Sequence, residues 1–137
     1  MDSFKGKYER VSADNYEEFL KALGVGLLLR KAATVSTPVM EVSEENGTWT
    51  IKTSTTLKTM ELKFKIGEEF DGTTPDGRDV TALVTLDGNK LVTVQKAKKD
   101  GVASTKSVRE FNGDEVVYTM TIDGNDDLVC VQKFKRV

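Results

Sequence analysis

The stretch TKSVREFNGDEVVYTMTIDGNDDLVCVQKF, residues 105–134, contains three runs of alternating side chains separated by two glycine turns. Asn112-Gly113 and Asp123-Gly124 are dipeptides that favour tight hairpin turns. The runs on either side of them are rich in β-branched and aromatic residues, which are common in strands. The stretch therefore predicts three antiparallel strands joined by two short turns.

The same pattern extends over most of the chain. Further turn dipeptides are Asn46-Gly47, Asp76-Gly77, Asp87-Gly88 and Asp100-Gly101, with Gly67 between the first two. Strand-like runs occupy residues 7–11, 39–42, 48–54, 60–66, 80–86, 91–95, 115–122 and 128–134. With shorter pieces they make about ten strands, and closure into an up-and-down barrel is the simplest way for such a meander to hide its edges. We expect an all-β barrel that encloses a cavity.

The residues before Pro38 follow a helical pattern instead. Between residues 15 and 23 the apolar side chains recur at helical spacing, Gly24 ends the run, and Ser12 and Asp14 are possible caps. A second helix is expected from Leu27 to about Val35, after Gly26. The pair would form a two-helix lid between the first and second strands. This helix pair is poorly suited to bind DNA, because the second helix has few basic residues.

Composition excludes several classes of function. The 137 residues fit one domain, 1–137, and 20 Lys and Arg against 22 Asp and Glu give a net charge of −2, which disfavours an electrostatic nucleic-acid binder. The chain has no His and a single Cys, Cys130, so Ser-His and Cys-His catalysis, a Cys/His zinc site and an internal disulfide are excluded. We expect that the protein is not an enzyme and binds neither a metal nor a cofactor. Since neither a signal peptide nor a long apolar run is recognisable, a cytoplasmic location is expected.

The strand faces leave two interpretations open. Cys130, Gln132 and Phe134 share one face of their strand, while Arg109 and Phe111 alternate with their neighbours in the same way. Polar groups among apolar ones would suit a ligand cavity. The alternative is that these side chains simply face water.

Over its whole length the chain resembles the intracellular lipid-binding proteins, which include the fatty-acid-binding and cellular retinoid-binding proteins. The resemblance rests on these motifs: Gly6-Lys-Tyr8, Asn15-Tyr-Glu-Glu-Phe-Leu20, Gly24-Val-Gly26, Arg30-Lys31, Pro38-Val-Met40, residues 51–59, Leu62-Lys-Phe64, residues 65–70, Asp76-Gly-Arg78, residues 85–88, Leu91 to Lys96, Arg109-Glu-Phe111 and residues 128–134. One departure is Arg10, where an apolar residue is usual. The resemblance implies a ten-stranded, non-catalytic barrel that carries a fatty acid or, alternatively, a retinoid.

The resemblance also implies a head-group site. Carboxylate-binding members hold the acid with two arginines and a tyrosine, and Arg109 matches the first arginine. Gln132 stands at the second arginine position and Phe134 at the tyrosine position, as in the retinol-binding and intestinal branches. With one charge and a neutral amide, we expect weaker selectivity for a carboxylate over an alcohol.

Further residues are assigned to the ligand's tail and to partners by position alone. The expected tail contacts are Tyr16, Phe19, Leu20, Leu29, Pro38, Met40, Thr53, Thr55, Leu57, Asp76, Arg78, Tyr118 and Met120. Lys21, Arg30 and Lys31 on the lid match positions that serve some relatives in nuclear import, and otherwise suit transient contact with an anionic membrane surface. We expect a monomer. A purely structural interaction module, with a filled barrel, remains a competing hypothesis.

Overall fold

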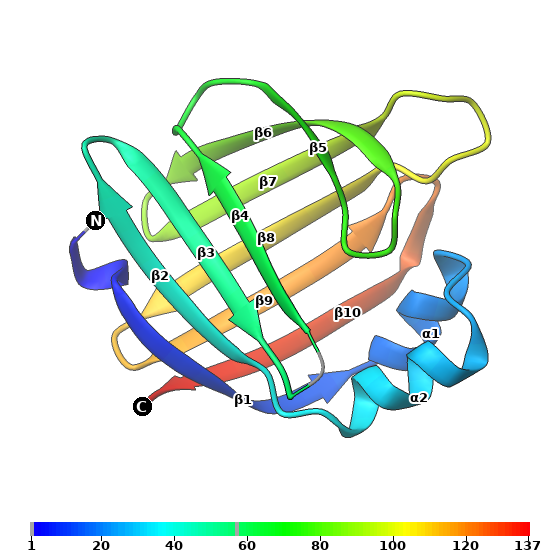
Figure 1. Cartoon of the computed structure of the whole chain (residues 1–137), viewed down its shortest axis with the longest axis horizontal. Coiled ribbons are helices and arrows are strands. Elements are labelled where there is room, and N and C mark those ends of the chain that lie inside the picture. Colours follow the sequence, from blue (N-terminus) through cyan, green and yellow to red (C-terminus); the bar gives the residue numbers. More distant parts are fainter. Residues whose placement is uncertain (1, 57) are drawn as a thin grey trace.

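A computed structural model describes residues 2–56 and 58–137, in which ten antiparallel strands form one sheet that curls into a nearly closed barrel (Figure 1). The elements are the 3-10 turn η1 (Asp2–Phe4) and the strands β1 (Gly6–Asp14), β2 (Val39–Glu45), β3 (Thr48–Ser54), β4 (Thr59–Phe64), β5 (Phe70–Thr73), β6 (Asp79–Asp87), β7 (Lys90–Ala97), β8 (Thr105–Asn112), β9 (Glu115–Ile122) and β10 (Asn125–Arg136). The expected fold class is confirmed.

The sheet order is β4-β3-β2-β1-β10-β9-β8-β7-β6-β5, so consecutive strands pair with each other except β4 with β5, and the two ends of the chain meet through the pairing of β1 with β10. The turn between β2 and β3 has positive φ at both Asn46 (53°) and Gly47 (84°), as a tight hairpin of this hand requires. The edge strands β4 and β5 face each other across the one unpaired seam of the sheet order.

The helices α1 (Tyr16–Ala22) and α2 (Leu27–Val35) lie between β1 and β2 and cover one end of the barrel (Figure 1). The predicted bounds of α2 are confirmed. The prediction that Ser12 and Asp14 cap α1 is wrong, because both residues belong to β1. The helix starts instead after Asn15, whose φ is 60° and whose side-chain amide donates to the carbonyl of Val129 (3.0 Å), so the turn is anchored to β10.

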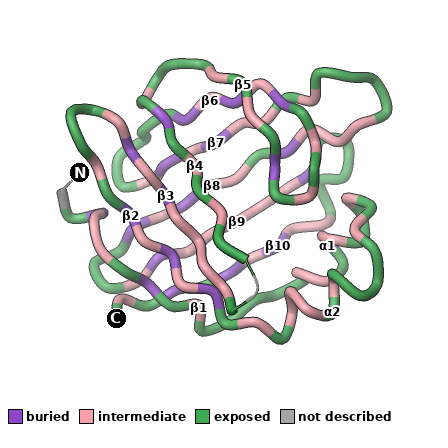
Figure 2. The backbone as a smooth tube through the Cα atoms, in the orientation of Figure 1, coloured by how far each residue is buried: buried purple, intermediate pink, exposed green. Residues whose placement is uncertain are grey.

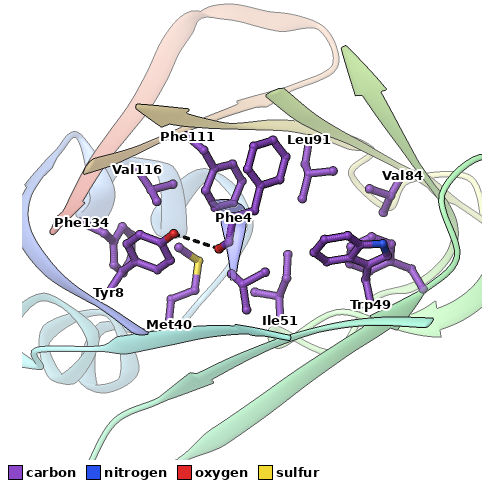
Figure 3. Close-up of a cluster of buried hydrophobic side chains, with 12 residues drawn as sticks. Phe4, Tyr8, Met40, Trp49, Ile51, Val84, Leu91, Phe111, Val116 and Phe134 are labelled. Carbon is purple, nitrogen blue, oxygen red and sulfur yellow. Dashed lines mark hydrogen bonds between the residues drawn. The ribbon is translucent and has the colours of Figure 1, made fainter. Parts of the chain in front are cut away.

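The main core lies near η1, at the end of the barrel away from the helices (Figures 1 and 3). Phe4 stacks on Phe111 with ring centroids 4.2 Å apart, Tyr8 meets Phe111 edge-on at 6.0 Å, and the Tyr8 hydroxyl donates to the Phe4 carbonyl (2.8 Å). Trp49, Ile51, Leu91, Val84, Met40 and Phe134 belong to the same buried cluster. This end is therefore packed by side chains.

Arg136 fixes the packed end to the N-terminus. Its guanidinium donates to the carbonyls of Lys5 (2.8 Å) and Ser3 (3.0 Å) and to the Tyr8 hydroxyl (2.9 Å). Gly6 has a φ of 142°, and a Cβ there would collide with Nη1 of Arg136. Glycine is therefore required at position 6 for this close approach.

A second, smaller cluster lies beneath α1. Phe19, Ile122 and Cys130 are buried together, with Tyr16, Leu23, Ala103 and Met120 packed against them. This cluster holds α1 against β9 and β10. Of the candidate head-group residues, Phe134 belongs to the main core, whereas Arg109 and Gln132 are buried polar residues.

Candidate ligand-binding site

The candidate head-group residues face the inside of the barrel. Arg109 on β8 is 7% exposed and Gln132 on β10 is 4% exposed. Phe134 is also buried, whereas its neighbours Lys133 and Lys135 are exposed. Buried and more exposed segments alternate along the strands of the barrel (Figure 2). This alternation is the period of a strand with one buried face. The interpretation that the polar residues of these strands simply face water is therefore wrong for Arg109 and Gln132.

The strand register aligns Arg109, Tyr118 and Gln132 in one row across β8, β9 and β10. Arg109 lies opposite Tyr118 on β9, and Tyr118 lies opposite Gln132 on β10. The guanidinium carbon of Arg109 is 4.1 Å from the centroid of the Tyr118 ring. A cation at this distance from an aromatic ring is attracted by the ring's quadrupole.

The charge of Arg109 has no counterion within the part of the chain that the structure describes. Its Nε is buried and has no hydrogen-bond partner, and none of the ion pairs among residues 2–56 and 58–137 includes it. Burying an unpaired charge is costly, and the cost is recovered when an anion arrives. The arrangement is therefore suited to hold a carboxylate.

Arg10 on β1 contacts Gln132 from the side of β10 that faces away from β9. Its Nη1 donates to Oε1 of Gln132 (3.2 Å), and its Nη2 donates to the carbonyls of Ser36 (2.8 Å) and Ala33 (3.4 Å). The guanidinium also lies 5.2 Å from the ring centroid of Tyr16. The sequence identified Arg10 as a departure from the family pattern and assigned it no role.

Most of the residues expected to contact the tail are buried or half-buried. Phe19, Pro38 and Met40 are buried, and Tyr16, Leu20, Thr53, Thr55, Tyr118 and Met120 are half-buried. Leu29 is not brought together with them, since its side chain is 70% exposed on α2. Leu57 lies outside the described residues.

Asp76 and Arg78 form a turn of their own between β5 and β6. Nε of Arg78 is 2.7 Å from Oδ2 of Asp76, the Thr74 hydroxyl donates to Oδ1 of Asp76 (2.8 Å), and Nη1 of Arg78 donates to the Ala103 carbonyl (2.7 Å). Burial opposes ionisation of Asp76, but the hydrogen bonds from Arg78 and Thr74 outweigh it and hold the pKa of this carboxyl below its ordinary value. The two charges thus neutralise each other and tie the turn to the loop before β8.

Two hollows on the outside of the barrel have linings unlike that of the candidate site. One, of about 420 Å³, lies at the β2–β3 hairpin and is lined by Ser43, Glu44, Glu45, Asn46, Thr48, Thr50 and Lys63. The other, of about 310 Å³, lies along the seam between β4 and β5 and is lined by Thr48, Lys63, Phe64, Lys65, Glu68, Glu69 and Phe70. Their many charged side chains make them poor sites for an alkyl chain, and neither includes Arg109 or Gln132.

The buried thiol of Cys130 gives a prediction about reactivity. Burial raises its pKa from 9.0 to about 12, although Gln132 and Arg10 act in the opposite direction. At pH 8 the native protein should therefore react with iodoacetamide about a thousandfold more slowly than after unfolding in urea, because the thiolate is the reactive form. Rapid labelling of the native protein would contradict this burial. The folded state loses stability relative to the unfolded state as the pH rises above about 9, because the thiol of the unfolded chain ionises first.

A nearly closed barrel with an inward arginine, a tyrosine beside it and two helices over one end defines a protein that binds small hydrophobic ligands. The chain matches the family described as "Lipocalin / cytosolic fatty-acid binding protein family" over residues 5–136. It belongs to this family, whose members are binding and carrier proteins.

Individual relatives cover nearly the whole chain. The chain is 44% identical to cellular retinoic acid-binding protein 2 of Mus musculus over 140 residues, 99% of each chain. The structure of apo lipid binding protein 8 of Caenorhabditis elegans covers 100% of this chain and 97% of that one, with a TM-score of 0.94 and 31% identity. A Schistosoma mansoni fatty acid binding protein in complex with arachidonic acid has a TM-score of 0.89 and 32% identity, over 100% of this chain and 98% of that one. No helix among the described residues is long and apolar enough to span a membrane.

Proposed function

We propose that the protein is a non-catalytic carrier of a long-chain fatty acid, held non-covalently inside the barrel with its carboxylate at Arg109 and Gln132. The observation that carries the proposal is the buried, unpaired guanidinium of Arg109. Residues 1–137 act as one lipid-binding domain, as a monomer in the cytoplasm.

The tail supplies most of the affinity in this proposal. Each buried methylene contributes about 0.8 kcal/mol, so an alkyl chain of about sixteen carbons represents on the order of 12 kcal/mol before the costs of association. The half-buried and buried residues named above, from Tyr16 to Met120, would surround it. Micromolar or tighter binding is expected.

A retinoid is the alternative ligand. Gln132 and Phe134 favour it by resemblance, and the retinoic acid-binding relative from Mus musculus supports it. Retinoic acid and a fatty acid share an ionised carboxylate on a long apolar body, so both fit the charge of Arg109. Retinol lacks that charge and would leave Arg109 unpaired.

The proposal is tested by identifying what the protein carries. The purified protein is extracted with organic solvent, and the extract is analysed by mass spectrometry beside an extract of an Arg109→Met variant prepared in the same way. We expect carboxylic acid lipids in the first extract and less of them in the second. A protein that yields no lipid and binds none after delipidation would instead be an interaction module.

We also propose transient contact between the lid and a membrane surface. Leu27, Leu28 and Leu29, at the start of α2, are 60%, 81% and 70% exposed. Of the three basic residues expected to serve this contact, Lys21 is exposed, whereas Arg30 donates to the carbonyl of Val25 (2.8 Å) and Lys31 pairs with Glu17 (2.9 Å). The exposed leucines therefore contribute more to this proposal than the cations do.

Substituting one of these leucines should slow delivery of ligand. Leu28→Asp is expected to lower the rate of transfer of a fluorescent fatty acid to phospholipid vesicles several-fold, because a charge replaces an apolar contact, while folding is unaffected at an exposed site. Val137→Asp, at an exposed residue near the opposite end of the barrel, is the matched control. Equal transfer rates for the parent and both variants would show that this turn does not touch the membrane.

A further inference from the structure

Arg10 lies on the inner face of β1, two residues after the buried Tyr8 and opposite the buried Phe134 of β10. Tyr8 and Arg10 lie opposite Arg136 and Phe134 of β10, but the register shifts between Arg10 and Ser12. The residue between them, Val11, is 56% exposed. The bulge therefore follows Arg10 and inserts one residue into β1. The long side chain of Arg10 reaches Gln132, which pairs with Ala13 farther along β1.

The hydrogen-bond partners of Arg10 among the described residues are neutral acceptors. They are the amide oxygen of Gln132 and the carbonyls of Ala33 and Ser36, and none of the ion pairs among residues 2–56 and 58–137 includes Arg10. Ala33 lies in the last turn of α2 and Ser36 is its C-cap, where the helix dipole favours a cation. The positive charge is therefore held in place but not neutralised by a carboxylate.

The amide of Gln132 links this cation to the head-group site. Because its oxygen accepts from Arg10, its NH2 group is the end that remains as a donor. Arg109 lies two strands away in the same row, over the ring of Tyr118. In the strand order β1-β10-β9-β8, Gln132 on β10 therefore lies between Arg10 on β1 and Arg109 on β8.

The two arginine and tyrosine pairs are also close enough to affect each other. Burial raises the pKa of Tyr16, the charge of Arg10 lowers it in part, and the hydroxyl of Tyr118 raises it further. The guanidinium of Arg10 lies over the ring of Tyr16, and the guanidinium of Arg109 lies over the ring of Tyr118. The mutual influence of the two phenols agrees with a shared site.

We propose that Arg10 is the second cation of the head-group site and makes the barrel selective for ionised carboxylic acids over esters and alcohols. This inference rests on the proposed function, since it concerns the same ligand. The carboxylate would accept hydrogen bonds from Arg109, from the NH2 of Gln132 and from Arg10. Strong selectivity for carboxylates then takes the place of the weak selectivity expected from the sequence, because the charge missing at position 132 is supplied from β1.

The test measures discrimination between an acid and its ester. Oleate and methyl oleate are titrated into the delipidated parent, Arg10→Gln and Arg10→Lys, and the ratio of the two dissociation constants is compared. We expect Arg10→Gln to reduce the preference for oleate about tenfold or more, and Arg10→Lys to retain most of it, because a charged donor is retained. Lys7→Leu removes an exposed positive charge from the same strand and should leave the ratio unchanged.

The outcomes separate this inference from the proposed function. If Arg10→Gln weakens both ligands equally, or neither, while Arg109→Met abolishes the preference, Arg10 only holds the lid and the inference is overturned. If the parent binds neither ligand, the proposed function fails with it. Should Arg10→Gln melt below the titration temperature without ligand, Arg10→Leu and Arg10→Lys give the same comparison with different packing.

Discussion

Arg109→Met is expected to weaken oleate binding about ten- to a hundredfold and to leave methyl oleate binding nearly unchanged. A hydrogen bond to a charged group contributes about 1.5 to 3 kcal/mol, and the ester lacks the charge that Arg109 would meet. Methionine keeps the length and the apolar stem of the side chain. Isothermal titration of the delipidated proteins measures both constants, and equal losses for the two ligands would remove Arg109 from the head-group site.

The same variant should fold at least as well as the parent when no ligand is present. Loss of the Tyr118 contact costs about 0.5 to 2 kcal/mol, but a buried charge without a counterion costs several kcal/mol and is removed at the same time. The free energy of unfolding in urea measures the balance. A marked loss of stability in Arg109→Met would mean that the arginine is a structural residue of the empty barrel.

Phe111→Ala should lower the free energy of unfolding by about 3 to 5 kcal/mol, because it removes a buried ring from the packed end of the barrel. The ring stacks on Phe4 and meets Tyr8 edge-on, so the substitution removes aromatic contacts and leaves a cavity. The midpoint of urea unfolding, followed by Trp49 fluorescence, measures the change.

Leu86→Ala is the matched control, because Leu86 is partly exposed on β6. It should change stability by no more than about 1 kcal/mol. If Phe111→Ala were as mild as this control, the cluster around η1 would not be the main source of stability. Acid binding, measured on the folded variant, should change much less than in Arg109→Met, because Arg109 remains in place.

Elements bounded by turn residues were predictable from sequence. The expected bounds of α2, β3 and β9 agree with the structure, since Gly26, Gly47 and Gly113 mark their starts. The caps of α1 were not predictable, because β1 pairs with β10 as far as Asp14 opposite Val131. Pairing with a distant strand overrides the local preference of Ser12 and Asp14 for a helix start.

The candidate site was predictable only in part. Alternation in β8 and β10 groups Arg109 with Phe111 and Gln132 with Phe134, but it does not show whether these faces point inward or toward water. Their burial in the structure decides it. The contact of Arg10 with Gln132 could not be predicted, because it depends on the pairing of β1 with a distant strand and on carbonyls near the end of α2. Leu29 was assigned to the tail by position, but no regular spacing in α2 indicated which side of that short helix faces solvent.

The most direct test of a carboxylate-binding barrel is a calorimetric titration of the delipidated protein with retinoic acid and with retinol, beside oleate and oleyl alcohol. We expect one equivalent of each acid to bind at micromolar or tighter affinity, and each alcohol to bind at least about tenfold more weakly, because Arg109 and Arg10 have no counterion among the described residues. Equal affinities for acid and alcohol, or no binding of either acid, would rule out a carboxylate-binding barrel.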